Sequence, residues 1–187
     1  MSSIRIFILS TLEEHGPLHG HRIRSLARQD RTETWTDIKA GSIYAALKRM
    51  QAEDLIELVK SEKEGNRPER SVYAITEEGR EALGIDLRDA LAQVEWRTDP
   101  FDLALARAHN QDPEVVRVFV QMRRDEFEQK ARSLEQQSKL ADPYLTEAER
   151  VVMRHLLGRA RAELAWHEQL LELLPGIVRD WKARKSP

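Results

Sequence analysis

The sequence contains no cysteine, and its 187 residues include only 8 glycines and 7 prolines. The absence of cysteine excludes disulfides, thiolate metal sites and cysteine nucleophiles. Because glycine and proline favour turns, their scarcity predicts few and short loops. No apolar run approaches the roughly 20 residues that span a bilayer, and residues 1–12 lack the cleavage site of a signal peptide. We therefore expect a cytoplasmic protein that has no membrane partner.

Neither sign of charge dominates, because 30 Lys and Arg stand against 32 Asp and Glu, with a formal net charge of -2. Hydrophobic residues make up 41% and charged residues 33%, a mixture typical of a folded protein with long solvated helices. Nucleic-acid-binding domains are often basic overall, so the net charge counts mildly against that class. The local surface steers a protein onto phosphate, so the positions of the basic residues matter more than their sum.

In the first part of the sequence, the spacing of apolar residues changes from a helical period to alternation. Apolar residues recur with helical spacing in residues 4–14, 19–28 and 43–53. Residues 55–60 and 71–75 instead alternate, which predicts two strands of a hairpin. A further helix follows. Three helices, a hairpin and a fourth helix predict a winged helix-turn-helix, in a chain that is mainly α with a small β-hairpin.

The rest of the chain has helical periodicity only. Helix starts are marked by Thr76, Asp99-Pro100, Asp112-Pro113 and the capping box from Thr146 to Glu149. Pro175-Gly176 predicts that the last long helix ends near Leu174. We expect a DNA-binding domain in residues 1–84 and a helical dimerisation domain in residues 85–187.

Several apolar stripes in these later helices are expected to face inward. The helix after Thr76 carries Leu83, Leu87, Leu91 and Val94, and the helix after Pro113 carries Val116, Phe119, Val120, Phe127, Ala131 and Leu134. The last helix carries a seam of Val152, Leu156, Ala160, Leu164, His167, Leu171 and Leu174. Two long helices cannot bury such broad stripes against one another alone, so the pattern predicts an intertwined homodimer.

The third helix has the chemistry of a recognition helix, the element that enters the major groove. Ser42 is placed as its N-cap, and the backbone N–H groups beside it can hold a phosphate. Its exposed face presents Tyr44, Lys48 and Arg49, and Lys39 precedes it. A charged helix face is otherwise an ordinary solvated one, so the winged-helix context carries this interpretation.

The hairpin tip is the second predicted DNA contact. It contains Lys63, Arg67 and Arg70, which would reach the backbone beside the major groove. Three glutamates in the same segment dilute this charge, so we expect few phosphate contacts there.

Several segments together resemble the PadR family of bacterial transcription regulators. They are Pro17 to Ile23, Gly41 to Met50, Asp54 to Ile56, Arg70 to Gly79 and Ala162 to Trp166. The blocks Gly-Ser-Ile-Tyr-x-x-Leu and Tyr-x-Ile-Thr-x-x-Gly are the specific part, and the long helical second half is similar to the larger subtype. The resemblance implies a homodimer that is held by C-terminal helices, binds a palindromic operator, and acts as a repressor released by a small molecule.

The sequence departs from the family pattern at two places. His19-Gly20-His21 replaces a usual Tyr-Gly-Tyr, so imidazole would take over a hydroxyl contact to phosphate. Asp54 replaces a usual glycine, and aspartate tolerates the left-handed turn better than most residues. His19 and His21 also suggest metal, but no third ligand lies nearby, so we expect no metal and no other cofactor.

Trp96 and Trp166 have two interpretations. Tryptophan is most often core or interface, and packing is the first of them. The second is contact with a small apolar or aromatic effector near the centre of the dimer.

Two other classes of function are alternatives to a DNA-binding regulator. One is a winged-helix protein-interaction module without DNA binding, which the net charge and the acidic hairpin favour slightly. The other is an enzyme, and the sequence contains no P-loop, Gly-rich dinucleotide turn, nucleophile elbow or zinc helix motif. We therefore predict no enzymatic activity and double-stranded DNA as the partner.

Overall fold

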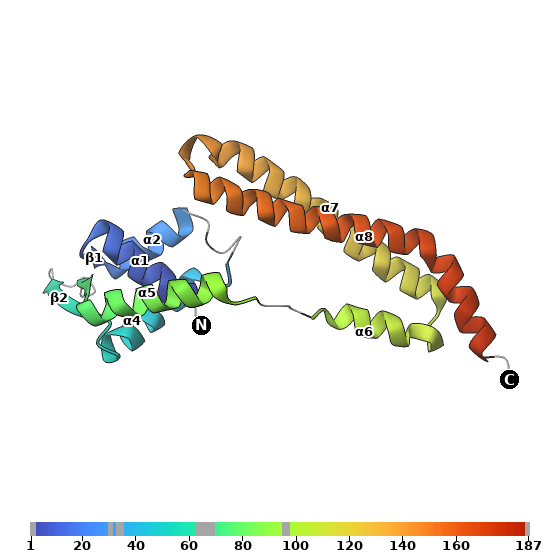
Figure 1. Cartoon of the computed structure of the whole chain (residues 1–187), viewed down its shortest axis with the longest axis horizontal. Helices are drawn as coiled ribbons and strands as arrows, with labels where there is room; N and C mark the ends of the chain where they lie inside the picture. The colour runs from blue at the N-terminus through green and yellow to red at the C-terminus, as the bar shows by residue number, and fades with distance from the viewer. Residues whose placement is uncertain (1–2, 30–31, 33–35, 63–69, 95–97, 186–187) are drawn as a thin grey trace. The chain divides into compact units, whose positions relative to one another are not determined.

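The computed structural model describes residues 3–29, 32, 36–62, 70–94 and 98–185 (Figure 1). The helices and strands are α1 (Ser3–His15), β1 (Leu18–His19), α2 (Gly20–Gln29), α4 (Ile43–Ala52), β2 (Ile56–Glu62), β3 (Arg70–Ile75), α5 (Glu77–Ala92), α6 (Pro100–Arg107), α7 (Pro113–Ala141) and α8 (Glu147–Lys185). In the described part of the chain, no helix is both long and apolar enough to cross a bilayer.

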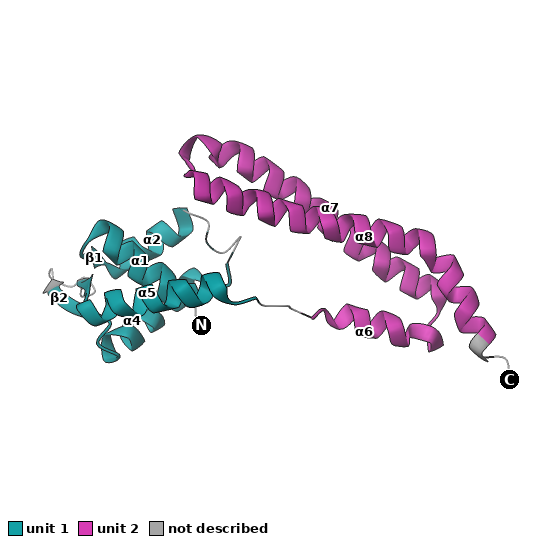
Figure 2. Cartoon of the chain, viewed as in Figure 1, with its two compact units in different colours: residues 1–95 teal, residues 96–187 magenta. Residues whose placement is uncertain are grey.

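The chain divides into two compact units, residues 1–95 and 96–187 (Figure 2). The boundary expected between residues 84 and 85 lies inside α5, and the structural division falls after that helix. The helix after the hairpin therefore belongs to the first unit.

The first unit has a core formed by one face of each of its helices together with the sheet. Its buried residues are Ile8, Leu9, Leu12, Ile23, Ala27, Ile43, Ala46, Leu47, Met50, Leu55, Ile56, Ile75 and Leu83. In α4, the buried positions recur at the spacing of one helical face. This arrangement fixes which side of α4 is left for solvent.

The predicted hairpin is present, and it gains a short third strand. The order is β1-β3-β2, with both pairings antiparallel. Leu18 of β1 pairs with Tyr73, and the register of β2 shifts between Leu58 and Lys60. A strand of two residues has no periodicity of its own, so its pairing with β3 defines it.

The turn after α4 explains the two family motifs that meet there. Asp54 has a φ of 56°, the left-handed conformation expected for the position where the family has glycine. Thr76 donates its hydroxyl to Asp54 O (2.7 Å) and accepts from Gly79 N (2.9 Å) as the N-cap of α5. A Cβ at Gly79 would lie 2.1 Å from Leu55 O, so only glycine allows α5 to pack this closely.

The predicted starts of the later helices are confirmed by their caps. Asp99 accepts from Phe101 N, and Asp112 accepts from Glu114 N, each at 2.9 Å. The capping box also forms, because Thr146 N donates to Glu149 Oε2 (2.7 Å) and Glu149 N donates to Thr146 Oγ1 (3.3 Å).

In the second unit, α7 and α8 lie side by side (Figure 1) and bury two apolar clusters. Ala160, His167 and Leu174 of the predicted seam are buried inside this unit. That part of the seam therefore needs no partner, contrary to the expectation from the sequence.

The last helix does not end near Leu174, because α8 continues through Pro175 to Lys185. Ile177, Val178 and Trp181 pack against the same cluster as Leu174, and this packing outweighs the missing N–H of the proline. Figure 1 shows α8 bending towards its C-terminal end, as expected for a helix with an internal proline.

Some residues expected to face inward are exposed in the single chain. Phe119 of α7 is 56% exposed, and Leu91 and Val94 are 87% and 91% exposed. Four exposed apolar residues gather in the first three turns of α7, and we call them the outer stripe of α7: Val115, Val118, Phe119 and Met122. Their spacing of three and four residues places them on one side of the helix.

Candidate nucleic-acid interface

The face of α4 predicted to meet DNA is exposed. Ile43, Leu47 and Met50 are buried in the core, whereas Lys48 and Arg49 are exposed and Tyr44 is 47% exposed. Since Tyr44 and Lys48 are four residues apart, they lie one above the other on the outer side of the helix. The Tyr44 phenol and the Lys48 ammonium can therefore contact the same ligand.

The start of α4 differs from the prediction. Ser42 has φ -85° and ψ -9° at the end of a 3-10 turn over Ala40–Ser42, and it makes no side-chain cap. Its hydroxyl donates to Lys39 O (2.7 Å). An N-cap needs an extended backbone, so the predicted cap by Ser42 is wrong. Lys39 and Ser42 are both exposed beside the first turn of α4.

Helix α2 carries three further cations, of which Arg24 lies beside Tyr44. Arg22 and Arg28 are exposed and Arg24 is half-buried. The sequence places these arginines on the outer side of the second helix, but we did not include them among the predicted DNA contacts. The run of residues 17–29 without an acid was the signal that could have identified them.

The cations of α2 and α4, together with Lys39, share one electrostatic property. They are Arg22, Arg24, Arg28, Lys39, Lys48 and Arg49, and none forms an ion pair with a carboxylate of a described residue. We call this set the free-cation surface. Since unpaired cations keep their hydrogen-bond donors and their positive potential, this surface suits a polyanion.

The two histidines before α2 stack on each other, with ring centroids 5.3 Å apart and planes at 29°. His21 is exposed, whereas His19 is half-buried and its Nδ1 has no hydrogen-bond partner among the described residues. Within the described ranges, no group of three or more acidic or histidine side chains is placed to hold a metal ion. Of the two histidines, His21 is the more exposed, and the predicted phosphate contacts of both stay predictions.

The hairpin tip is not part of the described chain. Lys63 and Arg67 lie outside the described residues, and Arg70 is described only by its backbone, which pairs with Glu62 in the sheet. The predicted contacts of these three cations stay predictions.

Trp96 likewise lies outside the described residues, whereas Trp166 of α8 is 39% exposed. Its ring meets Phe101 edge-on (centroids 5.9 Å apart) and His167 (4.8 Å). His167 is fully buried, its Nδ1 lies 2.7 Å from Glu163 O, and its Nε2 accepts from Arg123 Nε (3.1 Å). Trp166 is therefore the exposed edge of an aromatic cluster.

Arg123 connects this cluster to the start of α6. Its guanidinium lies 4.3 Å from the Phe101 ring centroid and pairs with Asp99. The Phe101 N–H and the Arg123 guanidinium hold the pKa of Asp99 below its ordinary value of 3.8. The cap of α6 is thus tied to α7 by charge.

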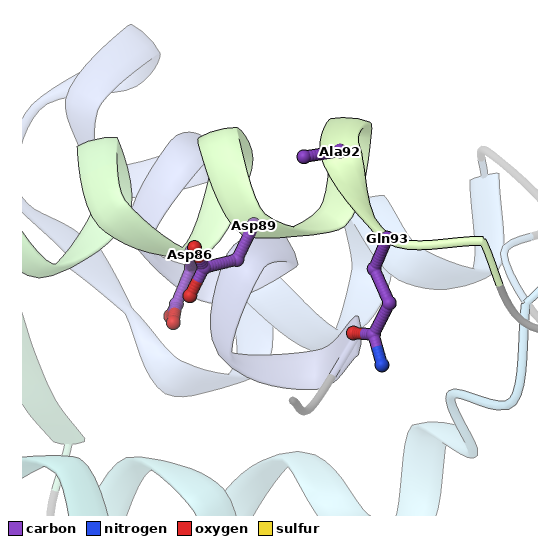
Figure 3. Close-up of a pocket in the computed structure, with 4 residues that line it drawn as sticks. All are labelled: Asp86, Asp89, Ala92 and Gln93. Carbon is purple, nitrogen blue, oxygen red and sulfur yellow. The ribbon is translucent and has the colours of Figure 1, made fainter.

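The hollow in Figure 3 has a different chemistry. Asp86, Asp89 and Ala92 of α5 line it together with Gln93, which follows the helix, and the close-up shows the two carboxylates and the amide. Asp86 already accepts from Arg5 Nε (2.7 Å) and Nη2 (3.3 Å). This polar lining does not offer the apolar walls that a flat effector would need.

Comparison with known proteins gives a family and a fold. Residues 8–85 match the Transcriptional regulator PadR-like family. Bacillus subtilis PadR in complex with operator DNA is similar, with a TM-score of 0.70 and 20% identity over 93% of this chain and 98% of that chain. No curated protein resembles the chain closely in sequence.

Two further solved structures are similar to the same extent. The PadR-like regulator BC1756 from Bacillus cereus gives a TM-score of 0.68 at 20% identity, over 93% of this chain and 99% of that one. The structure of Bacillus subtilis PadR with p-coumaric acid gives 0.69 at 20% identity, over 92% and 98%. These likenesses extend over both units, so the long helical second half is part of the shared fold.

Proposed function

We propose that this chain, which belongs to the PadR-like family of transcriptional regulators, binds a specific operator in double-stranded DNA and is not an enzyme. The free-cation surface is the observation that carries this proposal. Tyr44 and Lys48 are exposed on α4, and α4 is the helix that a winged-helix protein places in the major groove. A net charge of -2 is compatible with this role because the cations are concentrated locally.

Operator binding as a homodimer is the second part of the proposal. The outer stripe of α7 leaves Phe119 and Met122 each 56% exposed. A contiguous apolar stripe on a helix is expected to be covered by a partner. A dimer would set two copies of α4 about 34–36 Å apart, one turn of a palindromic operator. The palindrome and the repressor role rest on the resemblance to the PadR family.

Release by a small aromatic effector is the third part. The binding of p-coumaric acid by Bacillus subtilis PadR supports an effector of this class, and the exposed edge of Trp166 beside Phe101 offers an aromatic contact. With p-coumaric acid as the probe, we expect release of bound operator from the wild type and none from Trp166→Ala. Equal release from both proteins would exclude Trp166 from the effector site.

Selection of bound duplexes from a random pool, followed by a salt titration, tests DNA binding. We expect an enriched palindrome, and an affinity whose logarithm falls with the logarithm of salt at about 0.9 per phosphate contact. Lys48→Ala should weaken binding about tenfold and reduce that slope by about one. Tyr44→Ala should weaken binding without unfolding the protein.

The matched control is Lys130→Ala, which removes an exposed cation of α7 that is also unpaired among the described residues. It should leave affinity and slope unchanged. An affinity that does not respond to salt would instead favour the protein-interaction module.

A further inference from the structure

The ring of Tyr44 rests against α2, and this contact involves two residues of that helix. The guanidinium carbon of Arg24 lies 6.0 Å from the centroid of the Tyr44 ring. A Cβ added at Gly20 would lie 3.2 Å from Tyr44 Cε1 and 3.6 Å from Cδ1. Since Gly20 and Arg24 are four residues apart, they lie on one side of α2. We call these two residues the Tyr44 seat.

The polar atoms of this contact have no partner within the described part of the chain. Neither the Tyr44 hydroxyl nor the Arg24 guanidinium forms a hydrogen bond or an ion pair with any described residue. The ring is therefore held through its face and edge, while its hydroxyl stays open to an external partner. A cation over an aromatic face is attractive within about 6 Å.

Arg24 differs from the other arginines of its helix. Arg22 and Arg28 are exposed, whereas Arg24 is half-buried against the ring. A half-buried guanidinium reaches a phosphate less freely than an exposed one, and a planar guanidinium is well suited to stack on a ring. The position of Arg24 therefore fits a role through Tyr44 better than a direct role on DNA.

We propose that Arg24 is a positioning residue for operator recognition, which together with Gly20 holds the Tyr44 ring on α2 so that its hydroxyl meets the DNA. This inference rests on the proposed function and adds to it: α2 fixes the geometry of a recognition side chain on α4. A ring that is already fixed in the free protein loses less conformational entropy when DNA binds, so binding costs less free energy.

A double-mutant cycle on the selected operator tests the coupling. Arg24→Gln should weaken binding about three- to fivefold, the upper part of the range that a cation–π contact at an exposed site gives. In a Tyr44→Ala background, the same change should cost less than twofold. Arg24→Lys should lose less than Arg24→Gln, because lysine keeps a cation near the ring but loses the planar guanidinium.

Arg28→Gln is the matched control, because Arg28 is an exposed cation of the same helix. Its loss of affinity should be equal in the wild-type and Tyr44→Ala backgrounds, with a lower salt slope. If Arg24→Gln shows this additive pattern, Arg24 is a phosphate contact and the inference is overturned.

A measurement without DNA separates this inference from the proposed function. In the free protein, the ring current of Tyr44 should shift the Gly20 Hα resonances, and Tyr44→Leu should remove that shift. Gly20→Ala should displace the ring and weaken operator binding, and if that variant does not fold, Arg24→Gln carries the test by reducing the shift.

Unchanged Gly20 resonances in Tyr44→Leu would overturn the seat while leaving DNA binding intact. A wild-type protein that enriches no duplex would overturn the proposed function and operator positioning together, even where the ring-current shift is present.

Discussion

In the first unit, the cations of α2 and α4 meet no carboxylate of a described residue, whereas in the second unit every arginine of α7 is in an ion pair. Arg124, for example, forms ion pairs with three carboxylates, those of Asp125, Glu128 and Glu168. The pKa of Arg124 is raised above its ordinary value, mainly by the hydrogen bond to Glu168. The two regions contain similar residues but leave different potentials at their surfaces.

The difference in ion pairing agrees with the partner expected for each surface: DNA phosphates for the cations of α2 and α4, and protein side chains for the arginines of α7. Carboxylates beside the cations of α7 cancel the field and hold side chains of α7 and α8 together, as Arg124 and Glu168 do. A carboxylate beside Lys48 would have to be displaced before a phosphate could bind. Surface ion pairs add little stability each, so the pairing state is more informative about partners than about the strength of the fold.

The largest effect should follow charge reversal on the free-cation surface. Lys48→Glu should weaken operator binding at least about 100-fold, because a phosphate contact is lost and a repulsion is introduced. Fluorescence anisotropy at two salt concentrations measures this effect. Lys130→Glu changes the net charge equally on α7 and should bind within about twofold of the wild type. Similar losses in both variants would mean that only the total charge matters, and the contrast between the regions would fail.

A charge introduced on the apolar outer stripe of α7 should affect dimerisation before it affects DNA binding. Phe119→Glu places a charge in the outer stripe and should weaken the dimer about 100-fold, since a buried unpaired charge is costly. Sedimentation equilibrium measures the monomer–dimer balance, and operator affinity should fall with it. Gln129→Glu adds the same charge at another exposed position of α7 and should leave the dimer intact. A Phe119→Glu protein that still dimerises would place the interface elsewhere.

Arg5 is a cation of the first unit that does form an ion pair, so it tests whether paired cations serve the fold rather than DNA binding. Asp86 is 9% exposed and accepts two hydrogen bonds from Arg5, joining α5 to α1. Asp86→Asn should lower the free energy of unfolding by about 1–2 kcal/mol, measured by urea denaturation. The operator affinity of the folded protein should not change. The exposed neighbour Asp89→Asn is the control, and an affinity loss specific to Asp86→Asn would mean that pairing does not separate structural from binding cations.

The first unit was largely predictable from sequence because its signals are local. The period of α4 identified both its buried and its exposed face, and the cap at Thr76 agrees with the structure. The cap at Ser42 failed because a 3-10 turn precedes it, so its backbone is already helical. Nothing in Gly41-Ser42 distinguishes that turn from an extended approach.

The second unit was less predictable because its outcome depends on packing. Pro175 marks a helix end by local rules, but Trp181 and its neighbours continue the apolar face beyond it. Phe119 and Val120 are adjacent in an apolar run, and only the position of α8 decides that Val120 is buried. The contact between Arg24 and Tyr44 was missed for the same reason, since it joins two helices.

The smallest effect should come from Asp99, which is paired with Arg123 but 46% exposed as a side chain. Since the Phe101 N–H and Arg123 lower its pKa from 3.8, the ionised carboxylate stabilises the fold above that value. This contribution is lost as the pH falls through the lower pKa of the folded state. Asp99→Asn should therefore cost less than about 1 kcal/mol near neutral pH and nothing once the wild-type carboxyl is protonated. Thermal unfolding of both proteins across acidic pH measures the difference.

Asp102→Asn is the control, because Asp102 lies in the first turn of the same helix but has no ion pair with Arg123. A pH profile of Asp102→Asn identical to that of Asp99→Asn would assign the effect to the helix dipole rather than to the ion pair.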